Sequence, residues 1–293
     1  MRPDGLNFEL IREQLDTLLD GMELNLERQF PSTNEFGERE TLWLLFKVSL
    51  NTYRTIRWIC ADSKEESRYL QYSVSCPALV RTLVDHLCSV VFLLENLGQR
   101  ALWYSKAGWR EHVEKYQMYV QEFGSQPEWQ SYLNSLHAAN EWGAKLFCVT
   151  DEERANINSI PYWPIPSQMI KSSMAPGPDA ASRVFLRYLD AWFYRELSQQ
   201  SHLSYPGLAD RASLLLAAAR NEPQAESNLR QFKSTQVVMT ITMMLAICSE
   251  LETAFHFGFR TKIAVLWGIM NAGFPLSREV HEHRYADLLR DSN

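Results

Sequence analysis

Four polar side chains suited to catalysis or binding lie close together in the stretch WFYRELSQQSHLSYPGL, residues 192–208: Arg195, Ser198, Gln199 and His202. On a helix from about 180 to 203, residues seven apart differ by about 20° in direction, so Arg195 and His202 share one edge, roughly 10 Å apart along the axis. A helix C-terminus raises the pKa of a histidine such as His202 toward the range useful for acid–base chemistry. Arg195 and His202 are therefore the candidate catalytic pair. The alternative is that this edge only fixes how the helix packs.

The edge borders the apolar side of the helix, where a side chain can be half-buried against a neighbour. Tyr188 continues the polar line one heptad toward the N-terminus. On an earlier helix, Arg81 and Asp85 are four residues apart and so adjacent on the helix surface. We expect these two to reach the polar edge as a buried network, or else to form a purely structural ion pair.

Other polar residues carry weaker signals. His86 is expected to be a core histidine, and the HEH sequence at 281–283 is expected to be a solvated helix face. The chain has no H-E-x-x-H, no Cys₂His₂ spacing and no phosphate-binding glycine loop. We therefore expect neither a metal nor a cofactor.

The spacing of apolar residues is helical almost everywhere and predicts an all-α fold. We expect a helical hairpin over 7–62, followed by long helices to about 149. After these come the helix over 180–203, a long helix over about 223–257 and two short ones broken near Gly273 and Pro275. A proline-rich segment, 158–179, also holds Tyr162 and Trp163 and is expected to cover the helices, as a lid or as a cap on a core edge. The prediction is one domain of packed helices spanning 1–293.

Composition limits the kinds of partner. The 293 residues carry a formal net charge of −6, which argues against a broad basic surface coating nucleic acid. Five cysteines in no paired motif indicate reduced, mostly buried thiols. The first residues lack the apolar core of a signal peptide, and the longest apolar run, 237–248, is short for a bilayer. We expect a cytoplasmic protein with no membrane partner.

Two segments also carry a family resemblance. CPALVRTLVDHLCSVVFLLENLGQRA at 76–101 and YLDAWFYRELSQQSHLS at 188–204 resemble a family of bacterial all-helical domains that pair an R-x-x-x-[ED] helix with a later Y-x-x-L-S-x-x-x-H element. That family is distantly similar to the HEPN superfamily (higher eukaryotes and prokaryotes nucleotide-binding), whose motif is R-x(4–6)-H. The resemblance covers about 73–216, within a HEPN-like core over about 73–257.

The resemblance implies a helical bundle that often forms homodimers. Active HEPN proteins are metal-independent endoribonucleases of toxin–antitoxin and antiviral systems, in which an Arg and a His line one cleft. Carried onto this chain, these are Arg195 and His202. The hydroxyl of Ser198 is suited to orient His202 or to bind a phosphate oxygen, and the favoured alternative is that it bonds to the backbone carbonyl one turn back. Active members commonly have Asn, Asp or His after the Arg, where this chain has Glu196. The expected ligand is RNA or a nucleotide, and the alternative is a non-catalytic module that senses a nucleotide or binds a partner protein.

Overall fold

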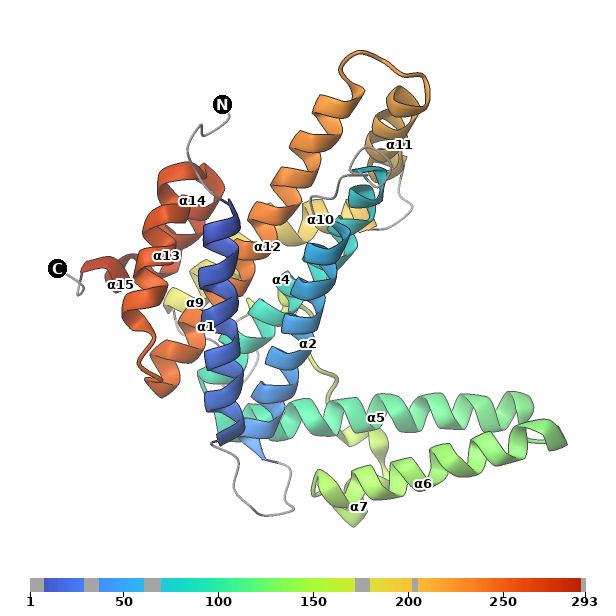
Figure 1. Cartoon of the computed structure of the whole chain (residues 1–293). Helices are drawn as coiled ribbons and strands as arrows, with labels where there is room; N and C mark the ends of the chain where they lie inside the picture. The colour runs from blue at the N-terminus through green and yellow to red at the C-terminus, as the bar shows by residue number, and fades with distance from the viewer. Residues whose placement is uncertain (1–7, 29–36, 61–69, 172–179, 202–204, 291–293) are drawn as a thin grey trace.

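The fold is all-α, as the sequence predicts. The computed structural model describes residues 8–28, 37–60, 70–171, 180–201 and 205–290, and no strand occurs within these ranges. The N-terminal hairpin pairs α1 (Phe8–Arg28) with α2 (Glu38–Ile59), and a 3₁₀ turn, η1 (Leu70–Ser75), leads into α4 (Cys76–Leu94). The C-terminal half contains α12 (Ala225–Phe255), α13 (Arg260–Gly273), α14 (Pro275–Arg284) and α15 (Ala286–Arg290). These helices form the body of the molecule (Figure 1).

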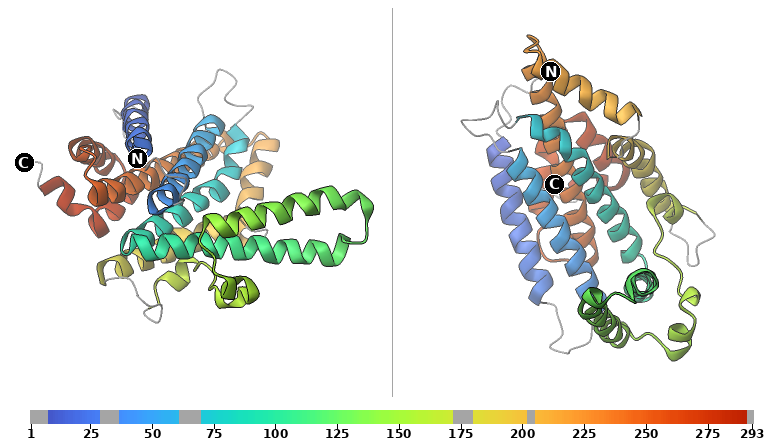
Figure 2. Two further views of the ribbon diagram at one scale, coloured as in Figure 1. Left: turned by 90° about the horizontal axis from the view of Figure 1, so that it is seen from below. Right: turned by 90° about the vertical axis from the view of Figure 1, so that its right-hand side faces the viewer.

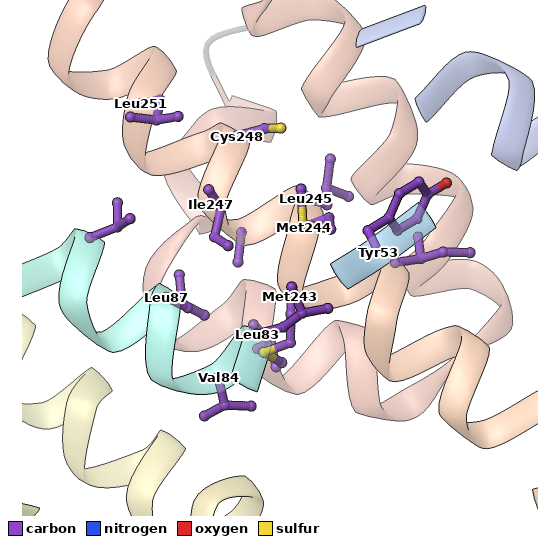
Figure 3. Close-up of a cluster of buried hydrophobic side chains, with 14 of the residues drawn as sticks. Tyr53, Leu83, Val84, Leu87, Met243, Met244, Leu245, Ile247, Cys248 and Leu251 are labelled. Atoms are coloured by element: carbon purple, nitrogen blue, oxygen red, sulfur yellow. The ribbon is translucent and has the colours of Figure 1, made fainter. Parts of the chain in front are cut away.

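The centre of the body is the contact between α4 and α12. Leu83 and Leu87 of α4 lie beside Met243 and Ile247 of α12, with Tyr53 of α2 at the edge of the cluster (Figure 3). All five side chains are at most 1% exposed. Complete burial of one such apolar side chain stabilises a fold by about 1.5–3 kcal/mol, so this contact is a main source of stability.

The middle of α12 is buried on all sides, which explains its apolar sequence. Its hydroxyl groups are satisfied within the helix, since Thr242 and Ser249 each donate to the carbonyl four residues back, at 2.8 Å. By length and composition, Leu70–Leu94 and Ala225–Phe255 could cross a membrane, but 61% and 83% of their most apolar stretches are buried inside this protein. Core helices show the same pattern.

A helical arm projects from the body. α5 (Leu97–Phe123), the short turn η2 (Pro127–Trp129) and α6 (Gln130–Leu146) form an antiparallel hairpin that extends away from the other helices (Figures 1 and 2). At its base, Trp109 donates its indole N–H to the carbonyl of Asn140 at 2.9 Å. The chain then returns through α7 (Asp151–Ala155), η3 (Ile157–Ser159) and α8 (Pro166–Met169).

The described part of the proline-rich segment, up to residue 171, packs on the helices. Trp163 makes edge contacts with Phe92 and Trp103, at 5.5 and 5.2 Å between ring centroids. Trp103 donates to the carbonyl of Pro161 at 3.0 Å, and Met169 is buried in the core. This part of the segment therefore covers an edge of the core. Residues 172–179 lie outside the described ranges.

Candidate functional site

The helix expected over 180–203 is interrupted in its middle. It consists of α9 (Ala180–Leu189), a π-helical turn η4 (Asp190–Tyr194) and α10 (Arg195–Ser201), and α11 (Tyr205–Ala219) follows it. The backbone N–H of Arg195 bonds to the carbonyl of Asp190, five residues back. A π turn accommodates about one residue more than an α turn, so it rotates everything after it relative to α9.

This rotation separates Tyr188 from Arg195. The Tyr188 hydroxyl donates to the carboxylate of Glu279 at 3.3 Å, and its ring stacks on His283 with centroids 4.0 Å apart. Burial raises its pKa. The polar line drawn through Tyr188 on an ideal helix is therefore wrong, because the π turn breaks the seven-residue alignment between Tyr188 and Arg195.

The same turn brings Tyr194 to α4. Arg81 donates through Nη2 to the Tyr194 hydroxyl at 2.8 Å, and its guanidinium carbon lies 4.9 Å from the centre of the Tyr194 ring. Arg81 belongs to the R-x-x-x-[ED] element and Tyr194 begins the Y-x-x-L-S-x-x-x-H element. Two segments more than a hundred residues apart therefore meet through one hydrogen bond.

Two acidic side chains lie beside this contact. Asp190 is 5% exposed, and its carboxylate pairs with Nη2 of Arg195 at 3.3 Å. Asp85 is half-buried, and burial raises its pKa to about 6 although Arg81 acts in the opposite direction. Burial raises the pKa of Cys88, and both acids are close enough to it to add to this shift. We call Arg81, Asp85, Asp190, Tyr194 and Arg195 the α4–α10 cluster.

Arg195 is the outermost member of this cluster. Its side chain is 71% exposed, more than the half-buried position expected at the edge of an apolar face. The carboxylate of Asp190 pairs with the Arg195 guanidinium at the surface. The other N–H groups of the guanidinium remain able to donate to an anion from solution. Arg195 therefore lies at the surface, paired with the buried Asp190.

The other predicted residues of this stretch are only partly described. Ser198 is half-buried and Gln199 is exposed, both on α10. His202 lies outside the described residues, so its position relative to Arg195 stays a prediction. Glu196 accepts a hydrogen bond from the side chain of Gln200 at 2.8 Å.

Two histidine expectations can be compared with the structure. His86 is half-buried, in accord with a core histidine, and its Nδ1 lies 2.9 Å from the Ser49 hydroxyl. The expectation of a solvated HEH sequence is wrong for His281, which is 3% exposed and 5.2 Å from the Trp267 ring. Its pKa is lowered by burial. Among the described residues, no three His, Cys, Asp or Glu side chains lie close enough to hold a metal ion.

Sequence reasoning overlooked two members of the cluster. Tyr194 was available as the first residue of the quoted Y-x-x-L-S-x-x-x-H element. Asp190 carried no signal, because an acid next to the apolar residues 191–194 looks like a solvated position until the π turn directs it inward.

Comparison of the chain with protein-family models, curated proteins and solved structures finds no match in any of the three.

Proposed function

We propose that this chain is a HEPN-like, metal-independent endoribonuclease whose site is the edge of the α4–α10 cluster, completed by His202. The observation that carries the proposal is the Arg81–Tyr194 hydrogen bond of 2.8 Å, which joins the two sequence elements of the family resemblance. A toxin or antiviral role follows from the same resemblance.

The proposed chemistry uses the nucleophile that RNA itself supplies. The 2′-oxygen attacks the adjacent phosphorus, the bond to the 5′-oxygen breaks, and the products are a 2′,3′-cyclic phosphate and a 5′-hydroxyl. His202 accepts the 2′-hydroxyl proton or donates a proton to the leaving 5′-oxygen. Arg195, exposed beside this site, stabilises the charge on the phosphate oxygens. Ser198 and Gln199, on the same helix, are placed to contact the substrate backbone.

Asp85 gives the site a group that titrates close to neutral pH. With a pKa of about 6, it changes charge where acid–base catalysis operates. It is a positioning residue in this proposal, because it neighbours Arg81 on α4.

The experiment is cleavage of an end-labelled single-stranded RNA in the presence of a chelator. His202→Ala should lower the rate at least about a hundredfold, as for loss of a general acid or base. Arg195→Lys should also be slow, since lysine keeps the charge and loses the planar donor fork. His137→Ala, at an exposed histidine of the arm, is the matched control and should cleave like the wild type. Full cleavage by a folded His202→Ala protein would remove this site from the mechanism.

A non-catalytic nucleotide-sensing module is the second candidate. Asp190 already pairs with the guanidinium of Arg195, and Glu196 follows Arg195 in the chain. A phosphate that binds Arg195 is therefore repelled by two carboxylates. This candidate predicts saturable binding of RNA or nucleotides without cleavage by the wild-type protein, and loss of that binding in Arg195→Lys.

The proposal includes a homodimer formed near α9 and α10. Two large apolar side chains of this segment point outward, since Val184 is 57% exposed and Trp192 is 70% exposed. Exposed aromatic residues of this kind are enriched in protein interfaces.

A further inference from the structure

Two cysteine side chains meet where the chain passes from α2 to α4. Cys60 caps the C-terminus of α2, and Cys76 is the first residue of α4. Their sulfur atoms lie 3.6 Å apart, so that one thiol donates a hydrogen bond to the other. The sulfurs of a disulfide are about 2.05 Å apart. The two atoms therefore need to approach by only about 1.5 Å, which is within reach of small side-chain rotations.

This pair is distinct among the cysteines of the chain. Cys88 and Cys248 are also buried, and Cys148 is exposed. No other two of the five sulfurs lie within hydrogen-bonding distance, and all five cysteines belong to the described part of the chain. The fold therefore brings together one specific pair of thiols, 16 positions apart in the sequence.

The turn that precedes Cys76 is itself fixed to the body. Leu70 and Val74 of η1 are buried against Leu229 of α12. A bond between Cys60 and Cys76 would close a loop that contains this anchored turn. Closing a loop of this length restricts the unfolded chain more than the folded one, so it stabilises the fold.

Burial limits when these thiols react. Both cysteines are completely buried, and the hydrogen bond with Cys60, together with burial, raises the pKa of Cys76. The reactive form of a cysteine is the thiolate, so the closed protein holds the pair as thiols at neutral pH. Both residues lie at helix ends, which fray more readily than helix centres. Opening of these ends, or folding itself, gives an oxidant access to the sulfurs while the contact between α4 and α12 persists or forms.

We propose that Cys60 and Cys76 form a reversible disulfide, with a low-molecular-weight disulfide such as oxidised glutathione as the oxidant. One cysteine thiolate attacks a sulfur of the oxidant, whose S–S bond breaks and releases one glutathione thiolate. The second cysteine thiolate attacks the protein-bound sulfur of this mixed disulfide and releases the second glutathione. Two protein thiols are oxidised, their two protons pass to the two glutathione thiolates, and one glutathione disulfide is reduced. The proposal does not depend on the proposed ribonuclease activity.

The test unfolds the full chain in urea and refolds it by dilution into oxidised or reduced glutathione, so that burial does not limit access to the thiols. N-ethylmaleimide then blocks the remaining thiols, and tryptic peptides are analysed by mass spectrometry. Trypsin cleaves after the basic residues around the two cysteines: Arg57, Lys64, Arg68 and Arg81. The disulfide therefore joins peptides 58–64 and 69–81, at a mass two hydrogens below that of the two reduced peptides.

The joined peptides should be the main disulfide product of oxidative refolding, and dithiothreitol should separate them. Cys88 and Cys248 should carry the maleimide in both samples. A different cysteine pair as the main product, or no disulfide within the chain, would overturn the proposal.

A thermal melt tests whether the native geometry accommodates the bond. The oxidised chain should melt about 5 °C above the reduced chain, as expected for a closed loop of this length in a protein of this size. Cys76→Ala should melt at the same temperature after refolding in either buffer. Cys148→Ala, which removes the exposed thiol, should keep both the joined peptides and the rise in Tm. An oxidised wild-type chain that melts at or below the reduced one would refute the proposal, because the fold would then oppose the disulfide.

Discussion

Asp85 and His86 are consecutive residues of α4 that lie in different surroundings. Asp85 neighbours Arg81 in the α4–α10 cluster, whereas His86 bonds to Ser49 of α2. Burial favours the neutral form of each side chain. It raises the pKa of Asp85 to about 6 and lowers the pKa of His86 to about 4. Their effects on stability therefore have opposite signs over the same pH range.

The first prediction compares Asp85→Asn with His86→Gln. Protonated Asp85 stabilises the fold below about pH 4, and this contribution is lost as the pH rises through about 6. Neutral His86 contributes stability above about pH 6.5, and this is lost as the pH falls toward about 4. Relative to wild type, the Tm of Asp85→Asn should therefore rise from pH 4 to 7, and that of His86→Gln should fall.

Thermal melts followed by circular dichroism between pH 4 and 8 check this prediction. His137→Gln, at an exposed histidine, should run parallel to wild type. The prediction is contradicted if the Tm of both Asp85→Asn and His86→Gln changes with pH in the same way as the Tm of the wild type. These two groups would then not be buried.

At this scale the sequence predicted only part of the site. It offered contact of Arg81 and Asp85 with the polar edge as one of two outcomes, and the structure shows Arg81 bonded to Tyr194, the residue before Arg195. It failed at Tyr188 and at Asp190. Both depend on one extra residue accommodated in a π turn, and no local preference of residues 190–194 marks that turn.

Among the elements, α14 is tied to α12 by a buried ion pair. Arg284 donates through Nε and Nη2 to the two oxygens of Glu250, at 2.7 and 3.0 Å, and Tyr285 donates to the same carboxylate at 2.8 Å. Glu250 is 6% exposed. The acid therefore depends on Arg284 for its counter-charge, and the C-terminal helices depend on this contact for their position.

Arg284→Met should lower the free energy of unfolding by about 3 kcal/mol, because it leaves a buried carboxylate with one neutral partner. Arg230→Met is the matched control. Arg230 pairs with Glu226 at 2.6 Å, but both side chains are well exposed, so the loss should stay below about 1 kcal/mol. Urea unfolding measures both values, and equal effects of the two substitutions would contradict the role assigned to Glu250.

Helix boundaries were the most predictable feature at this scale. Apolar spacing gave the outer limits of the α1–α2 hairpin and of α12 to within a few residues, because α1 and α2 each bury a continuous stripe and the middle of α12 is buried around nearly its whole circumference. The arm was not predicted. The amphipathic pattern of α5 and α6 shows that each helix packs against another helix. It does not show that, over the outer part of the arm, α5 and α6 pack mainly against each other.

For the whole molecule, the single all-α fold was predicted correctly, and the homodimer remains to be measured. A dimer mass is expected by light scattering at micromolar concentration. Trp192→Glu should shift the mass to that of a monomer, since a charge would be buried in the interface. Trp58→Glu, at an indole that is 81% exposed on α2, should remain dimeric. A monomeric wild-type protein would remove the dimer from the proposed function.

The arm gives the molecule two levels of cooperativity. Its outer contacts join α5 to α6 or to the turn between them, as in the stacking of Tyr116 on His137 and of Phe123 on Trp129. Such contacts between nearby residues form and break without the long-range packing of α4 on α12. Backbone amide hydrogens at the arm tip should therefore exchange with solvent when the arm alone opens. Those in the middle of α12 should exchange only when the whole protein unfolds. A protease that cuts only opened chain would nick the tip first and leave two fragments held together by the intact body.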